Sequence, residues 1–205
     1  NPALVNKAAH GSNQTLWPSA ASLSFVEAAF HHACCIFPSP TIHIGRASTD
    51  WAPWESDSSL MHAGLTSGAA IERLFIDRAL RTLHVHGRRA AAWDTLTRAY
   101  PTPPPRTILL AHRPGDVGRR AAEYSGAPWI LADANILTLS HPGRANSPLE
   151  PARTLSGRLI HALRGERLKG VEAAAWSSTI TTPDLLFYRI LPRLLVVAEA
   201  AWHGE

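Results

Sequence analysis

The sequence predicts a mixed, helix-rich α/β fold, in which a helical N-terminal half packs with a small βαβ unit containing a short parallel sheet. Apolar residues recur at helical spacing over residues 19–37 and 67–83. Farther along, two short apolar runs at 107–111 and 129–132 are separated by a polar segment of helical character. A strand, a helix and a strand at this spacing predict parallel strands, because a crossover connection joins parallel neighbours.

The first half is expected to be largely helical. Residues 1–18 predict an irregular arm, and a helix is predicted from Ser19 until Pro38 ends it. Residues 41–44 predict a short strand, and a long loop with Trp51 and Trp54 follows. A further helix over 88–100 is predicted from the apolar side that it would form, with Trp93, Leu96 and Tyr100.

The second half carries the strands and two further helices. Asp116 is a plausible N-cap for the helix between the strands, and Pro151 suits the first position of the next helix. Thr182, Pro183 and Asp184 predict the start of the last helix, which Pro192 is expected to kink. We expect one domain over 1–205, with a possible internal boundary near 101–106, because neither half alone would bury much surface.

The charge of the chain is positive and almost entirely due to arginine. The 205 residues carry a formal net charge of +4, and Lys7 and Lys169 are the lysines among the 20 basic residues. Guanidinium groups bind carboxylates and phosphates in bidentate fashion and tolerate burial at interfaces. This composition fits an anionic partner or a protein interface, although a GC-rich genome would produce the same bias.

The cysteines and the hydropathy limit the cellular compartments in which the protein is expected. Cys34 and Cys35 are adjacent, so the peptide between them disfavours a disulfide, and a reducing intracellular compartment is favoured. No apolar run reaches the roughly 18 residues that cross a bilayer, so we expect no membrane span. The sequence contains no motif of a nucleotide-binding fold, no serine-hydrolase elbow and no motif that indicates a cofactor.

The segment 112–120 is the most suggestive candidate for ligand binding. A predicted strand runs into a glycine-containing turn that opens a helix, and unpaired N–H groups at a helix N-terminus attract anions. The residues expected to hold an anion are Arg113, Gly115, Gly118, Arg119 and Arg120. The alternative is an ordinary capped turn with surface arginines, in which Asp116 occupies the place of an anion.

The candidate catalytic residues and the candidate metal ligands do not form complete sites. His112 and Asp133 follow the two predicted strands and should lie near each other, since functional residues of α/β folds gather at the carboxyl ends of strands. His84 and His86 are candidate metal ligands, but residues two apart on a helix diverge by about 200°. His31, His32, Cys34 and Cys35 are four potential ligands in five residues, but on a helix only His31 and Cys34 or Cys35 share a face, and no second cluster would complete a zinc site.

Trp51 and Trp54 are the candidates for partner binding, because exposed tryptophan and arginine are enriched at interfaces. Since no catalytic set is complete, the sequence favours a non-catalytic subunit or adaptor of a protein or ribonucleoprotein assembly. Protein partners are then expected, and nucleic acid is an open alternative. The competing hypothesis is a small α/β enzyme that binds a phosphorylated or carboxylated substrate at 112–120.

Overall fold

The computed structural model describes residues 15–45, 49–140, 155–159 and 162–203. The chain divides into two compact units, Asn1–Thr107 and Ile108–Glu205. Both combine helices with parallel strands, which confirms the predicted mixed α/β class. The single domain over 1–205 and the boundary near 101–106 stay predictions, and most of the expected arm lies outside the described residues.

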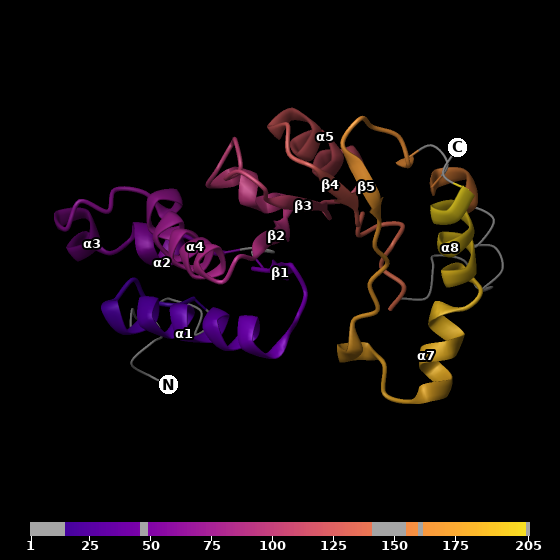
Figure 1. The fold of residues 1–205 in the computed structure, drawn as a ribbon, viewed down its shortest axis with the longest axis horizontal. Helices are drawn as coiled ribbons and strands as arrows, with labels where there is room; N and C mark the ends of the chain where they lie inside the picture. Colours follow the sequence, from indigo (N-terminus) through magenta and orange to yellow (C-terminus); the bar gives the residue numbers. More distant parts are fainter. Residues whose placement is uncertain (1–14, 46–48, 141–154, 160–161, 204–205) are drawn as a thin grey trace. The chain divides into compact units, whose positions relative to one another are not determined.

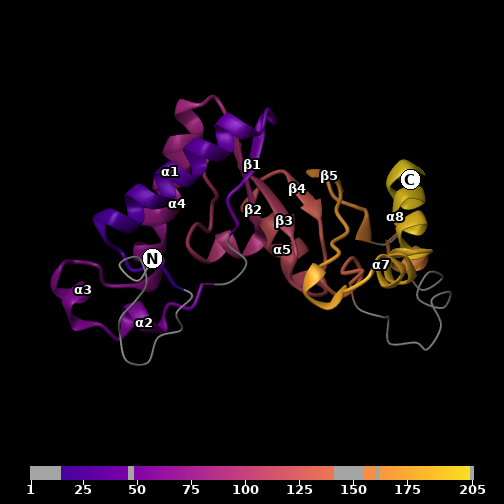
Figure 2. The ribbon, with the colours of Figure 1, turned by 90° about the horizontal axis from the view of Figure 1, so that it is seen from below.

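Two long helices dominate the first unit. Helices α1 (Ala20–Ile36) and α4 (Gly68–Val85) lie side by side in both views (Figures 1 and 2). A serine caps each N-terminus, since the Ser19 hydroxyl accepts from the N–H of Ser22 at 3.1 Å and Ser67 does the same for Ala70 at 3.2 Å. Both predicted helices are therefore confirmed. Two short helices, α2 (Ala52–Glu55) and α3 (Ser58–His62), lie between them in sequence.

Each long helix leads into a short strand of the first unit. Strands β1 (Thr41–His43) and β2 (Arg89–Trp93) pair in parallel, with Ile42 opposite Ala90. The predicted helix over 88–100 is wrong, because this segment forms β2 and then the 3-10 helix η2 (Asp94–Arg98). Ala90, Ala91 and Ala92 are buried in the strand, so pairing and burial override the helical propensity of alanine.

The core of the first unit forms where the helices cover the strands. One buried cluster contains Cys34 of α1, Ile42 of β1, Leu83 of α4 and Ala90 of β2, so each of these four elements contributes one side chain. A second cluster joins Trp54, Leu60 and Ile71 around the N-terminal half of α4. The two clusters fix both ends of α4, and they explain why Ile71 and Leu83 are almost fully buried.

The second unit contains the predicted βαβ unit and one more strand. Strand β3 (Ile108–Ala111), helix α5 (Asp116–Ser125) and strand β4 (Trp129–Leu131) follow one another, and β3 pairs with β4 in parallel. Strand β5 (Leu168–Val171) pairs in parallel with the other edge of β4. The predicted strand, helix and parallel strand are confirmed, whereas β5 was not predicted because Leu168, Lys169 and Gly170 form no apolar run.

The C-terminal helices differ from the single kinked helix that was expected. Helix α7 (Pro183–Ile190) starts at the predicted Thr182 cap, and Pro192 separates it from helix α8 (Arg193–His203). Figure 1 shows the two helices as successive yellow segments. The 3-10 helix η3 (Ser177–Thr179) precedes them. Across the described residues, no helix combines the length and apolar character that a membrane span needs.

The burial along α4 predicts a clear difference between two leucines. Leu83 is 1% exposed and Leu74 is 38% exposed. We expect Leu83→Ala to lower the free energy of unfolding by about 2–5 kcal/mol, because it leaves a cavity in the cluster with Ile42. The matched Leu74→Ala on the same helix should cost less than about 1 kcal/mol. Urea denaturation measures both, and equal losses would contradict this packing.

Candidate functional site at the carboxyl ends of β3, β4 and β5

Polar side chains follow all three strands of the second unit. His112 comes directly after β3, Glu172 comes directly after β5, and Asp133 lies two residues beyond β4. Because the three strands run parallel, these positions share one edge of the sheet. This is the edge at which α/β folds place their functional residues.

Backbone hydrogen bonds continue past the strand ends and hold this edge together. The N–H of Ala134 donates to the carbonyl of His112 at 2.9 Å, and the N–H of Glu172 donates to the carbonyl of Leu131 at 2.8 Å. Farther on, the N–H of Ala174 donates to the carbonyl of Leu137 at 2.9 Å. The segments that carry His112, Asp133 and Glu172 are therefore cross-linked through their main chains, which restricts where their side chains point.

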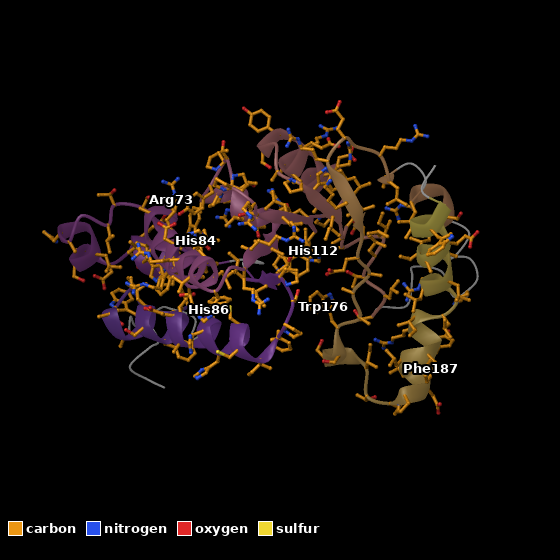
Figure 3. The ribbon with its side chains drawn as sticks, in the orientation of Figure 1. Arg73, His84, His86, His112, Trp176 and Phe187 are labelled. Carbon is orange, nitrogen blue, oxygen red and sulfur yellow. The ribbon has the colours of Figure 1, made fainter. Side chains whose placement is uncertain are left out.

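His112 is held in one tautomer by its surroundings. Its Nδ1 lies 3.1 Å from the carbonyl oxygen of Ala132, and a carbonyl only accepts, so Nδ1 carries the proton. In the neutral ring, Nε2 then has the lone pair. The ring is half-buried and meets the Trp176 ring edge to face, with centroids 6.5 Å apart (Figure 3). His112 and Trp176 thus form one aromatic cluster at this edge.

Glu172 contributes an acidic group to the same cluster. The residue is exposed as a whole, yet partial burial of its carboxyl group raises the pKa, while the neighbouring His112 acts in the opposite direction. Burial disfavours the charged carboxylate because the protein solvates it less well than water does. A carboxyl group of this kind stays protonated to higher pH than an ordinary surface glutamate and can still reach solvent.

Asp133 lies at the same edge, as expected, but its carboxylate is used for hydrogen bonds to the backbone. It is only 6% exposed, and its carboxylate accepts from the N–H of Asn135 at 2.7 Å and from the N–H groups of Gly115 and Ile136. Burial raises its pKa, and the three backbone hydrogen bonds offset part of that rise. The carboxylate therefore joins the end of β4 to the turn after β3, and a catalytic role for Asp133 stays a prediction.

The charged side chains at the glycine-containing turn before α5 form ion pairs with one another. Asp116 pairs with Arg119 at 3.1 Å and with Arg120 at 3.5 Å, and Arg119 also reaches Glu123 at 3.0 Å. The N–H of Gly115 donates to the Asp133 carboxylate, so a protein side chain occupies the place of an external anion. Anion binding by Arg113, Gly115, Gly118, Arg119 and Arg120 stays a prediction that this geometry does not favour.

Gly118 has a packing role in the same turn. A Cβ at this position would lie 2.9 Å from the backbone nitrogen of Arg113 and 3.1 Å from the carbonyl carbon of Ala111. The helix approaches the end of β3 so closely that no side chain fits there. Gly118 thus allows this contact between α5 and β3.

The metal candidates of the first unit lie in a different arrangement. His86 Nε2 lies 3.0 Å from His31 Nδ1, so His86 pairs with α1 rather than with His84. Cys35 Sγ lies 3.8 Å from His31 Nε2, on the other side of that ring. Among the residues that the structure describes, no group of three His, Cys, Asp or Glu side chains could hold a metal ion.

The tryptophans expected to bind a partner are packed within the first unit. Trp54 is 2% exposed, and its indole N–H donates to the carbonyl of Leu16 at 3.1 Å. Trp51 is half-buried, donates to Glu72 at 3.0 Å and lies under the Arg98 guanidinium, 4.3 Å from the ring centroid. Trp54 is therefore buried and Trp51 is partly exposed, and partner binding by the two rings stays a prediction that this packing does not favour.

The carboxyl ends of β1 and β2 carry residues that were not singled out. The His43 and Trp93 rings meet with centroids 4.9 Å apart, and burial lowers the pKa of His43. Asp94 follows Trp93 and is fully buried. In the second unit, Glu172 and Trp176 were also missed, since only the recognition of β5 would have placed them at a strand end.

Comparison with known proteins identifies the relatives of this chain. The sequence profile of "Glycosyl hydrolase family 20, catalytic domain" matches residues 3–205. A β-hexosaminidase of Porphyromonas gingivalis is 24% identical over 194 residues, which are 87% of this chain and 25% of that protein. The chain therefore spans about a quarter of the length of this curated relative.

Solved structures show the same fold. The family 20 exo-β-N-acetylglucosaminidase of Vibrio harveyi, in complex with N-acetylglucosamine, has a TM-score of 0.77 at 19% identity, covering 94% of this chain and 33% of that one. The β-N-acetylhexosaminidase of Bacteroides fragilis has a TM-score of 0.71 at 21% identity, covering 92% and 42%. These similarities concern the fold of the matched part.

The family match corrects the functional prediction from the sequence. A non-catalytic subunit with protein or nucleic acid partners is wrong, because the matching profile describes the catalytic domain of a glycosidase family. The competing hypothesis, an enzyme that binds a phosphorylated or carboxylated substrate at 112–120, gains no support from these relatives, which are named as hexosaminidases and an N-acetylglucosaminidase. The error arose because arginine and tryptophan content was taken as a sign of interfaces.

Asp133 is predicted to act as an anchor for the strand ends. Asp133→Ala should lower the free energy of unfolding by about 1–3 kcal/mol, because the backbone N–H groups of Gly115, Asn135 and Ile136 lose their charged acceptor. The exposed Glu166, which precedes β5, offers a control, and Glu166→Ala should stay within about 0.5 kcal/mol of the wild type. Thermal and urea unfolding measure both changes, and a neutral Asp133→Ala would refute the anchoring role.

The raised pKa of Glu172 predicts a pH dependence of stability. The folded state favours the protonated carboxyl group, so this contribution is fully present below the unfolded pKa of about 4.3. It is lost as the pH rises through the higher folded pKa. The stability of the wild type relative to Glu172→Gln should therefore fall as the pH rises from about 4 to about 7. A difference that is constant or rises with pH in urea titrations would contradict the assigned direction.

Proposed function

The chain belongs to glycosyl hydrolase family 20, and from this premise we propose that the carboxyl edge of β3, β4 and β5 binds a terminal N-acetylhexosamine as part of a β-N-acetylhexosaminidase. The observation that carries the proposal is the cluster of His112, Glu172 and Trp176 at one sheet edge. The relatives from Vibrio harveyi and Bacteroides fragilis are named for N-acetylglucosaminidase and N-acetylhexosaminidase activity. Since this chain spans part of each relative, the activity of the whole protein is part of the proposal.

The chemistry of the cluster suits a sugar. Trp176 is 45% exposed, so part of its ring can cover the apolar face of a pyranose. Glu172 can accept hydrogen bonds from sugar hydroxyls, and bonds to a charged acceptor are worth about 1.5–3 kcal/mol. An apolar ring face beside a few polar groups is the usual composition of a small-molecule site.

Hydrolysis adds the requirement for an acid. Family 20 enzymes use assistance from the substrate in place of a protein nucleophile, but a group must still protonate the leaving oxygen. The acids that follow the described strands are Asp94, Asp133 and Glu172, of which Asp94 and Asp133 are buried. Of these three, Glu172 is the one that a bound sugar can reach, and its raised pKa suits an acid.

A second candidate function is sugar binding without turnover. It is favoured by the scarcity of accessible acids at the strand ends. The sequence that follows β1 reads Ile44-Gly45-Arg46-Ala47-Ser48-Thr49, and the next acid is Asp50. If Glu172 only accepts hydrogen bonds from the sugar, the site would bind an N-acetylhexosamine and leave its glycosidic bond intact.

Measurements of binding and turnover on the same variants test both candidates. We expect Glu172→Gln to weaken N-acetylglucosamine binding by about 10- to 100-fold in calorimetry, the equivalent of a lost charged hydrogen bond. The matched Glu166→Gln, at the opposite end of β5, should bind as the wild type does. Hydrolysis of 4-nitrophenyl N-acetyl-β-D-glucosaminide by the wild type would identify the glycosidase.

The combined outcomes are distinct. Binding without hydrolysis supports the second candidate, and hydrolysis that Glu172→Gln abolishes supports the first. Wild-type protein that neither binds N-acetylglucosamine nor hydrolyses the chromogenic substrate rejects both. Equal effects of Glu172→Gln and Glu166→Gln would place the sugar away from this edge.

A further inference from the structure

We infer that a pocket between α1 and α4 binds a small molecule through a carboxylate, phosphate or sulfate group. The pocket has a volume of about 440 Å³ and lies entirely within the first unit. Helix α1 lines it with Glu27, His31 and two small residues, and α4 lines it with Arg81, His86 and their neighbours. A cavity of this size accommodates a small organic ligand.

The charges in the pocket favour an anion. Glu27 is the acidic residue of the lining, and its carboxylate pairs with Arg78 at 2.8 Å, so its charge is balanced. Arg81 adds an exposed guanidinium, which binds oxyanions in bidentate fashion. With the Glu27–Arg78 ion pair counted as neutral, Arg81 leaves one net positive charge at the pocket before any histidine is protonated, although Arg78 itself does not line the pocket.

The paired imidazoles add a second element to this balance. His31 Nδ1 and His86 Nε2 are 3.0 Å apart, and the ring centroids are 4.9 Å apart. A neutral pair shares one hydrogen bond, and protonation of one ring keeps that bond while adding a positive charge. Other titratable or charged side chains around the pair on the two helices are Glu27, His32, Cys35, Arg78, Arg81 and His84. The imidazole pair thus adds hydrogen-bonding groups beside Arg81 at the pocket.

The pocket is separate from the proposed sugar site. His86 is the C-cap of α4 and precedes β2, so it lies toward the amino end of that strand. The sugar site was assigned to carboxyl ends of strands in the other unit. The inference therefore does not depend on the proposed function, and the failure of one would leave the other intact.

A titration with sulfate tests the inference, since sulfate keeps its charge across the pH range of histidine. The protein is labelled in its histidine rings, and the signals of His31 and His86 are assigned from His31→Asn and His86→Asn. We expect saturable shifts of both signals with a dissociation constant of about 1 mM. Sodium chloride at matched ionic strength should not reproduce them.

Two arginine variants provide the decisive comparison. Arg81→Gln should weaken sulfate binding about two- to fivefold, the scale of an exposed ion pair, and the exposed Arg164→Gln in the other unit should leave it unchanged. Acetate in place of sulfate shows whether the pocket prefers a planar carboxylate or a tetrahedral oxyanion. Shifts that do not saturate, or an affinity that is equal in Arg81→Gln and in the wild type, would overturn the inference.

Discussion

Strand β4 pairs with β3 along one edge and with β5 along the other, and the arrangement of polar groups in the second unit depends on this pairing. The strand is short, but Trp129 and Leu131 are almost fully buried. Because all three strands run in parallel, their carboxyl ends coincide, and the residues that follow them are brought to one edge. Backbone hydrogen bonds from Ala134 and Glu172 then extend the cross-linking beyond the strands themselves.

The same edge assigns different roles to chemically similar residues. Burial raises the pKa of the Asp133 carboxyl group and that of the Glu172 carboxyl group. The Asp133 carboxylate accepts three backbone N–H groups, and so it fixes the turn before α5. Glu172 stays exposed beside His112, and the His112 ring in turn meets the accessible ring of Trp176. Environment rather than residue type therefore separates the anchor from the candidate binding group.

Much of the local structure follows from the sequence, whereas the site follows from the order of the strands. Apolar periodicity was enough to predict α1 and α4, and the apolar runs were enough for β3 and β4. The segment Arg89–Trp93 was predicted as part of a helix from the spacing of Trp93, Leu96 and Tyr100, and only its pairing with β1 makes it a strand. Glu172 and Trp176 could not be found without β5, whose residues show no strand periodicity. Likewise, the polar sequence around Trp54 gives no sign that its indole N–H donates to the carbonyl of Leu16, which lies far away in the sequence.

The central claim is that a carbohydrate occupies the carboxyl edge of β3, β4 and β5, beside His112, Glu172 and Trp176. A crystal structure of the protein soaked with N-acetylglucosamine tests this claim most directly. The account predicts density for one sugar ring against the exposed part of Trp176, with a hydroxyl within hydrogen-bond distance of the Glu172 carboxylate. A bound sugar elsewhere on the protein, with this edge occupied by water alone, would contradict it.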